Sequence, residues 1–277
     1  MLADTAYGKS GVRLVKVTRH EDRHVLRDLT VAVRFEGDYD ASYVDGNNSD
    51  VLPTDTMKNT VYALAARTPL DEPESFGLAL AEHFLERNPK LHRITIDLTE
   101  HLWGRIAVSG RVHGHAFLRE GPDSRTAQVR MDRQEAQVRA GIAGLIILKS
   151  SQSAFSGFPR DEYTTLPETR DRLLATSLTA TWRYDSGAAY GPAWHAIRRT
   201  LLEAFANHIS ESVQHTLHAM GRAVLGTVPE VADIHIVMPN RHHLPIDLTH
   251  FGLENRNEIF VATEEPFGLI QATVRRS

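Results

Sequence analysis

The order of the predicted secondary structure elements constrains the fold of this chain most, because one series of strands and helices occurs twice. In the first half, residues 11–19 and 23–37 are rich in aliphatic residues with charged residues between them, as is typical of strands. Residues 54–68 and 71–89 carry apolar side chains at helical spacing, and strand patterns return in 91–120. The first half is therefore predicted to run strand, strand, helix, helix, strand, strand.

The second half repeats this order. Strand patterns in 126–151 and 172–186 precede two amphipathic helices within 192–226, and strand patterns close the chain. Antiparallel hairpins with helices grouped on one face indicate an α+β fold. We therefore predict two units of one kind, residues 1–124 and 125–277. A sheet of about four strands leaves exposed edges, which favour association between copies of the chain.

Charge and residue content exclude several classes of function. The formal net charge is −4 at pH 7, which argues against a general surface for nucleic acid or for an anionic membrane. The chain has no cysteine, which excludes disulfides, thiol catalysis and thiolate metal sites. The sequence shows no apolar targeting segment, no stretch of transmembrane length and no Ser-Lys-Leu peroxisomal signal, so a cytoplasmic protein is predicted.

Gly8-Lys9-Ser10 matches the end of the phosphate-binding loop G-x-x-x-x-G-K-(S/T), but two features exclude that interpretation. The first glycine of the motif would stand where this chain has Ala3. The motif should also open a helix, whereas the residues that follow predict a strand. On these residues alone, Lys9 is predicted to be a solvated lysine that precedes a strand.

Other polar clusters have ordinary structural explanations when each is taken alone. His113 and His115 would share one face of a strand, but no third ligand at a fixed spacing accompanies them, so no metal site is predicted. Residues 54–55 are typical of a helix N-cap. Residues 165–168 form a capping box, which predicts a helix after them. Residues 238–248 are typical of a hairpin turn within a strand region.

Four stretches taken together, in this order, resemble the urate oxidase (uricase) family: YGKSGVRLVKV, PTDTMKNTVYALA, GLIILKSSQSAFSGFPRDEYTTLPETRDRLLAT and MPNRHHLPIDL. The later stretch NEIFVATEEPFGLIQATV is also similar, so the resemblance extends over about residues 7–275. The third stretch is highly specific, whereas YGK alone is not. Pro53, Ser156 and Met238 depart from the usual residues of the family, and none of them has an assigned role.

The resemblance implies the tandem tunnelling fold, whose repeated unit of strand, strand, helix, helix, strand, strand agrees with the order described above. Family members assemble as homotetramers that enclose a tunnel and share active sites between subunits. The implied reaction belongs to purine catabolism and uses neither metal nor cofactor. It converts urate, molecular oxygen and water into 5-hydroxyisourate and hydrogen peroxide.

The resemblance also assigns a substrate-binding set whose chemistry suits urate, a flat anion near neutral pH. Arg172 offers a guanidinium fork, Gln214 offers a donor and an acceptor, and Phe155 offers a ring face for stacking. Val213 and Asn240 correspond to neighbours of the urate and of the oxygen or water site. The complete set is Thr54, Asp55 (through its backbone amide), Phe155, Arg172, Val213, Gln214 and Asn240.

Catalysis is assigned by the same resemblance to Lys9, Thr54 and His242. Oxygen reacts poorly with a closed-shell monoanion, and removal of a second proton from urate raises the electron density that can pass to oxygen. Lys9 can accept that proton when it is neutral, Thr54 can relay it, and His242 is the next acceptor.

Other classes of function remain open at this point. One is another tunnelling-fold enzyme that acts on a purine or pterin, with or without a metal. A second is a purine-binding relative without catalytic activity, and a third is a structural assembly protein.

Overall fold

The computed structural model describes residues 2–185 and 187–276 of the chain. They form two compact units that divide between Gly141 and Ile142, with residues 187–192 belonging to the first unit. The division at residues 124 and 125 remains a prediction about where the sequence repeat begins. No helix in the described part of the chain is long and apolar enough to cross a membrane.

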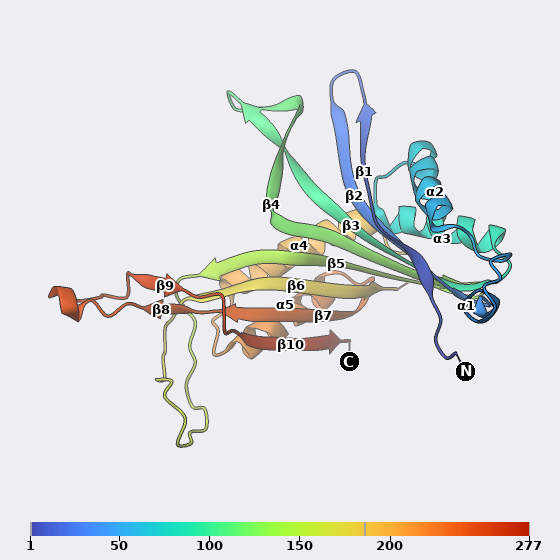
Figure 1. Cartoon of the computed structure of the whole chain (residues 1–277). Coiled ribbons are helices and arrows are strands. Elements are labelled where there is room, and N and C mark those ends of the chain that lie inside the picture. The colour runs from blue at the N-terminus through green and yellow to red at the C-terminus, as the bar shows by residue number, and fades with distance from the viewer. Residues whose placement is uncertain (1, 186, 277) are drawn as a thin grey trace. The chain divides into compact units, whose positions relative to one another are not determined.

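The first unit is an antiparallel sheet with helices on one face (Figure 1). Its strands are hydrogen-bonded in the order β1 (Tyr7–Arg19), β2 (His24–Gly37), β3 (Leu91–Val108) and β4 (Arg111–Asp132). Its helices are α1 (Asp40–Val44), α2 (Thr54–Arg67) and α3 (Pro73–Arg87). Helix α3 packs on β3 and β4, and α2 packs on β1.

The core of the first unit lies between its sheet and α3. Every second side chain of β2 from Leu29 to Phe35 is buried, because side chains of a strand alternate between its two faces. On α3, Phe76, Leu80 and Phe84 are buried at helical spacing, and Phe84 meets the ring of Phe35 edge to face with centroids 5.2 Å apart. Pro73 begins α3, where a missing amide hydrogen is harmless.

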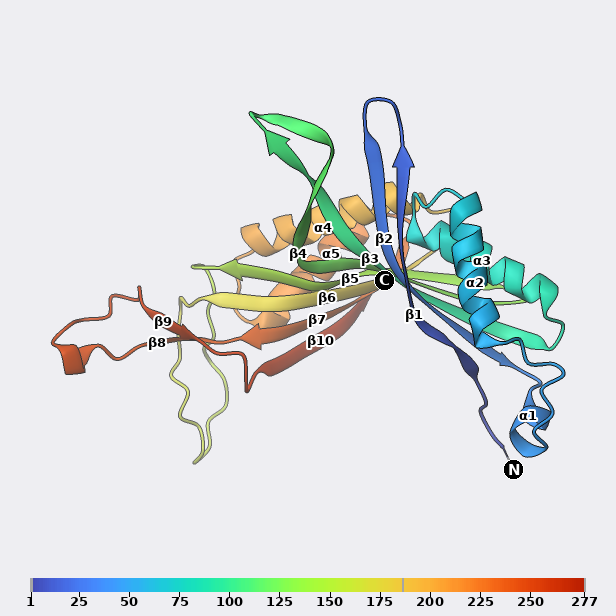
Figure 2. The ribbon, with the colours of Figure 1, turned by 45° about the horizontal axis from the view of Figure 1, so that its top comes forward.

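The second unit repeats this arrangement. Its strands are β5 (Ala136–Lys149), which begins in the first unit, β6 (Leu174–Tyr184), β7 (Val231–Arg241) and β10 (Gly268–Arg275), in that order. Helices α4 (Tyr190–Asn207) and α5 (Val213–Thr227) lie on one face of these strands in both ribbon views (Figures 1 and 2). Both helices bury an apolar stripe, which on α4 includes Trp194, Ile197 and Leu201.

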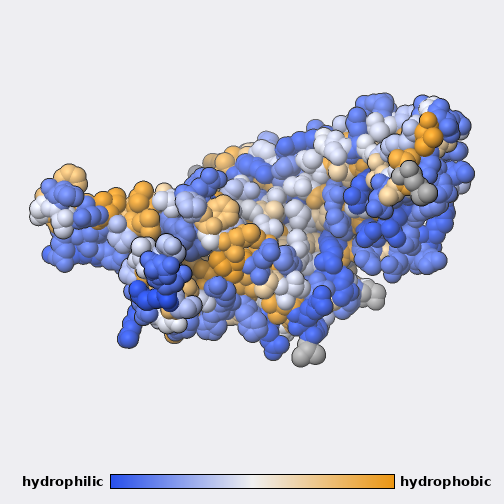
Figure 3. Space-filling view, turned by 60° about the horizontal axis from the view of Figure 1, so that its bottom comes forward, coloured by the Kyte–Doolittle hydropathy of each residue, from blue (hydrophilic) through white to orange (hydrophobic). Residues whose placement is uncertain are grey.

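A separate hairpin extends from the end of β7. It pairs β8 (His243–Pro245) with β9 (Phe260–Ala262), and the 3-10 helix η1 (Thr249–Phe251) lies between them. Figure 3 shows apolar surface on this hairpin at the left of the view. Its exposed apolar side chains are Leu244, Ile246, Phe251, Leu253, Ile259 and Val261.

The predicted order of elements is confirmed, with two corrections. Strand β1 begins at Tyr7 rather than at residue 11, so Lys9 lies inside the strand and not before it. The helix predicted after residues 165–168 is wrong, because the chain from Ser156 to Leu173 forms neither helix nor strand. Its two ends are held instead by backbone pairing of Phe155 with Thr169, which keeps the segment as a closed loop.

Candidate active site

A cavity of about 330 Å³ in the second unit contains four of the residues that the sequence assigned to the site. Phe155 and Arg172 stand at the two ends of the loop between β5 and β6, whereas Asn240 and His242 stand at the end of β7. The size of the cavity suits a small ligand. Its other lining residues are Leu166, Pro167, Glu168, Thr169, Asp171, Leu173, His243, Leu244, Pro245, Asn257 and Phe260.

Phe155 and Arg172 form a stacked pair. The guanidinium carbon of Arg172 lies 5.2 Å from the centroid of the Phe155 ring. Two backbone pairings hold them: Phe155 N donates to Thr169 O at 2.8 Å, and Arg172 N donates to Ser153 O at 2.8 Å. The Arg172 side chain is half-buried, its Nε has no hydrogen-bond acceptor among the described residues, and burial lowers its pKa. A guanidinium with free donors beside a ring is suited to a flat anion.

Asn240 and His242 add an amide and an imidazole to the same cavity. Asn240 Nδ2 lies 3.5 Å from His242 Nδ1, and the ring of His242 is half-buried. The backbone of His242 is held by Thr263, whose N donates to His242 O at 2.9 Å. The hairpin turn predicted at residues 238–248 is wrong, because β7 continues to Arg241 and β8 begins at His243, with His242 alone in the break between them.

Phe158 is a further aromatic residue that the sequence reasoning missed. Its ring stacks on Phe155 with centroids 4.8 Å apart and an interplanar angle of 16°. The ring of Phe155 therefore has Phe158 stacked against it in addition to the guanidinium of Arg172 that lies over it. The signal was present, because the two phenylalanines stand three residues apart in one polar loop, FSGF.

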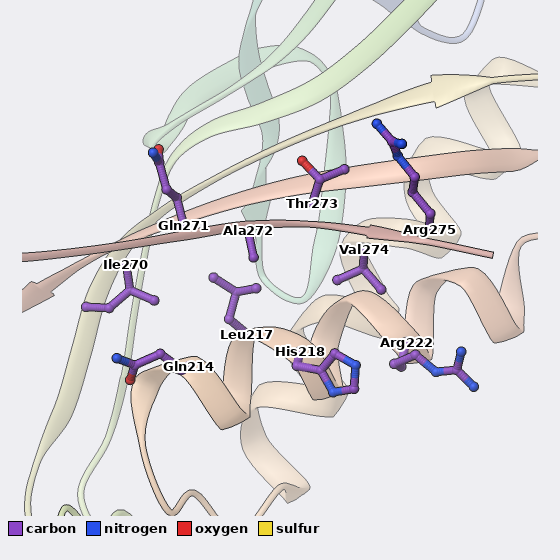
Figure 4. A pocket seen from close by; sticks show the side chains of 10 residues that line it. All are labelled: Gln214, Leu217, His218, Arg222, Ile270, Gln271, Ala272, Thr273, Val274 and Arg275. Carbon is purple, nitrogen blue, oxygen red and sulfur yellow. The ribbon is translucent and has the colours of Figure 1, made fainter. Parts of the chain in front are cut away.

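Gln214 and Val213 begin α5, beside a second cavity of about 330 Å³ between α5 and β10 (Figure 4). Val213 is buried, whereas Gln214 is exposed and lines this cavity. Figure 4 shows Gln214 and Ile270 at the same end of the cavity. On β10, Ile270 lies two residues from Gly268, which pairs with Asn240, so this end adjoins the residues of the first cavity.

Lys9 lies in the first unit, on β1 at a β-bulge. The register with β2 shifts between Lys9 and Val12, and Gly11 has a φ of 70°. Gly8 passes so close to β2 that a Cβ on it would lie 1.9 Å from the carbonyl oxygen of Val33. Glycine is therefore required at position 8, and the bulge sets the direction of the half-buried Lys9 side chain.

Thr54 and Asp55 form the first turn of α2. The N-cap explanation for them is wrong, because Pro53 occupies the N-cap and Thr54 is the first helical residue. The hydrogen bond and charge of Lys58 hold the pKa of the Asp55 carboxyl below its usual value, and the charge of Lys9 contributes least. Backbone N–H groups at a helix start lack helical partners and favour an anion.

Two histidines of β4 lie side by side. His113 and His115 lie on β4 with ring centroids 4.5 Å apart, as their spacing predicted. Among residues 2–185 and 187–276, no three His, Asp or Glu side chains are grouped so that they could hold a metal ion.

The structure defines an α+β protein with a small cavity lined by aromatic, guanidinium, amide and imidazole groups, and comparisons with known proteins specify the family. The family model "Uricase" matches residues 5–130 and 138–271. The chain is 44% identical to the uricase of Arthrobacter globiformis, covering 100% of this chain and 90% of that protein. It is 36% identical to the uricase of Aspergillus flavus, covering 98% and 95%. The chain belongs to the uricase family.

Solved structures agree with this assignment. The crystal structure of the Arthrobacter globiformis uricase superposes with a TM-score of 0.95, covering 100% of this chain and 95% of that one. The urate oxidase of Bacillus sp. TB-90 superposes with a TM-score of 0.84 at 25% identity, covering 98% and 100%. The predicted tunnelling fold is confirmed.

Proposed function

We propose that the chain oxidises urate with molecular oxygen and water to 5-hydroxyisourate and hydrogen peroxide, and that its own side chains supply the chemistry. Urate oxidase activity follows from membership of the uricase family. The observation that carries the assignment of the site is the Phe155–Arg172 pair, which shares a cavity with Asn240 and His242.

Substrate binding follows from the shape and charge of urate. Phe155 stacks on one face of the purine, and the Arg172 guanidinium donates in the plane to a carbonyl oxygen and a ring nitrogen. Gln214 contacts another edge, where its amide can both donate and accept. Val213 packs beside the purine, and Asn240 faces the oxygen or water site. The side chain of Thr54 and the backbone amide of Asp55 add contacts from α2.

The oxidation requires a base. Lys9 in its neutral form accepts the second proton of urate through the hydroxyl of Thr54, and His242 is the next acceptor. The resulting dianion passes two electrons to oxygen, which takes up two protons and leaves as hydrogen peroxide. Water adds its hydroxyl at C5 of the oxidised purine and releases a proton, which gives 5-hydroxyisourate.

The active protein is proposed to be a homotetramer whose sites are shared between copies. Lys9 and Thr54 belong to the first unit, whereas Phe155, Arg172 and His242 belong to the second. Support comes from the edge strands β1 and β10 and from the exposed apolar hairpin β8–β9. A cytoplasmic location remains a prediction from the sequence.

Mixing two inactive variants tests the shared site. Lys9→Met and Arg172→Met should each abolish turnover, but co-expressed chains should recover up to about a quarter of wild-type activity when each site draws on two copies. No recovery in mixed oligomers of confirmed composition would contradict a shared site. Light scattering of the wild-type protein measures the number of subunits.

The role of Lys9 is tested by comparing turnover with binding. Lys9→Met should lower kcat by at least about a hundredfold and change the inhibition constant of xanthine, which lacks the 8-oxo group, by less than about twofold. Near-normal turnover would contradict the role of base. Urate consumption and peroxide release are measured with a chelator present. If the chelator abolishes both signals and added metal restores them, the metal-dependent alternative is favoured.

A further inference from the structure

Ser210 connects the two segments that carry Phe155 and Gln214. It lies in the connection between α4 and α5 and is 1% exposed. Its backbone pairs with the start of the Phe155 loop: Ser210 N donates to Gln152 O at 3.0 Å, and Ala154 N donates to Ser210 O at 2.7 Å. The second of these bonds is made by the residue that directly precedes Phe155.

The hydroxyl of Ser210 is bonded to the start of α5. Its Oγ donates to Ser212 O at 3.0 Å and accepts from the hydroxyl of Thr216 at 2.7 Å. A serine hydroxyl has one hydrogen, so the donation to Ser212 O requires that Thr216 is the donor in the second bond. Ser212 is the N-cap of α5, and its Oγ accepts from His215 N at 3.1 Å.

We propose that Ser210 is a positioning residue for urate, which sets the start of α5, and with it Gln214, relative to the Phe155 loop. This inference rests on the proposed function. Phe155 contacts the face of the purine and Gln214 contacts its edge, so both grip the ligand only when the two segments keep a fixed separation. Ser210 joins them through its backbone on one side and its hydroxyl on the other.

Two substitutions separate positioning from stability. Ser210→Ala removes both the bond to Ser212 O and the bond from the Thr216 hydroxyl, whereas Thr216→Val removes only the second of these bonds. Ser210→Ala should raise both the KM for urate and the inhibition constant of xanthine about tenfold, with kcat within about twofold of wild type. Thr216→Val should lower the unfolding midpoint but leave both constants unchanged. In the double variant both constants should stay raised.

A hydroxyl at the far end of the same helix provides the control. Thr227 Oγ1 donates to Ala223 O at 2.9 Å, and Thr227→Val should change neither KM nor the inhibition constant. The inference is overturned if Ser210→Ala has the wild-type KM for urate and the wild-type inhibition constant of xanthine. It is also overturned if these two constants change in parallel with the unfolding midpoint across all four variants. Failure of the unaltered chain to consume urate would instead overturn the proposed function.

Discussion

Replacement of Gly8 by alanine should inactivate the enzyme through the position of its neighbour Lys9. The added Cβ would lie 1.9 Å from Val33 O and 2.9 Å from the Cα of Arg34, both of them backbone atoms of β2. An ordinary contact between carbon and a carbonyl oxygen is about 3.3 Å, so β1 must move by about 1.4 Å at this residue. A flexible side chain could turn aside, but a paired strand cannot.

The expected effect on turnover is large because the displaced strand carries the proposed base. A misplacement of about 1 Å in catalytic geometry can lower the rate about a hundredfold, and kcat for Gly8→Ala should fall by at least that factor. The forced contact should also lower the free energy of unfolding by about 1–3 kcal/mol. The rate at which urate absorbance decreases measures kcat, and unfolding in urea measures the free energy of unfolding.

Gly46→Ala is the matched control for this prediction. Gly46 has a φ of 67° and no atom within 4 Å of its added Cβ, so alanine there is strained only by its left-handed backbone. That strain lowers the free energy of unfolding by about 1–2 kcal/mol but should leave kcat unchanged. The reasoning is refuted if Gly8→Ala retains wild-type kcat, or if both variants lose turnover in proportion to their stability.

Three further changes have defined outcomes. Arg125 Nη2 donates to Glu74 Oε2 at 2.6 Å where both side chains are buried, so Arg125→Met should lower the free energy of unfolding in urea by about 3–5 kcal/mol, and an unchanged midpoint would contradict this. His101 Nδ1 accepts from Arg119, and burial, Arg13 and Arg119 lower its pKa. Because the pKa of His101 in the folded protein lies below its value near 6.5 in the unfolded chain, the contribution of His101 to the free energy of unfolding is complete above about pH 6.5. This contribution is lost as the pH falls. The loss of stability at low pH should be smaller in His101→Gln. Arg172→Lys keeps the charge but loses the fork, so KM for urate should rise about tenfold in steady-state assays, and an unchanged KM would contradict bidentate binding.

Local patterns were sufficient to predict most of the elements. The helical spacing of apolar residues in α3 and α5 and the alternation in β2 are periodicities that a short segment carries by itself. The capping box at residues 165–168 failed because local preference for a helix start is weak. Backbone pairing of Phe155 with Thr169 outweighs it and holds the segment as a loop.

The members of the site could be assigned from motifs, but their geometry could not. The pattern FSGF brings two phenylalanines close together in the chain, but it does not show that their rings stack, and no pattern shows that the buried hydroxyl of Ser210 bonds to the start of α5. These contacts join residues only two or three positions apart, but the backbone between them is neither helix nor strand, so their distances depend on how the surrounding strands and helices pack. A local periodicity carries no information about such distances.

The opening motif Gly8-Lys9-Ser10 shows where the division lies. The sequence alone determined that it is not a phosphate loop, because the first glycine is missing and β-forming residues follow. Only the tertiary structure decided why glycine stands at position 8 and where Lys9 lies. Strand β2 passes within contact of Gly8, and a bulge follows Lys9. Each of these depends on a partner distant in sequence, which packing alone brings to the lysine.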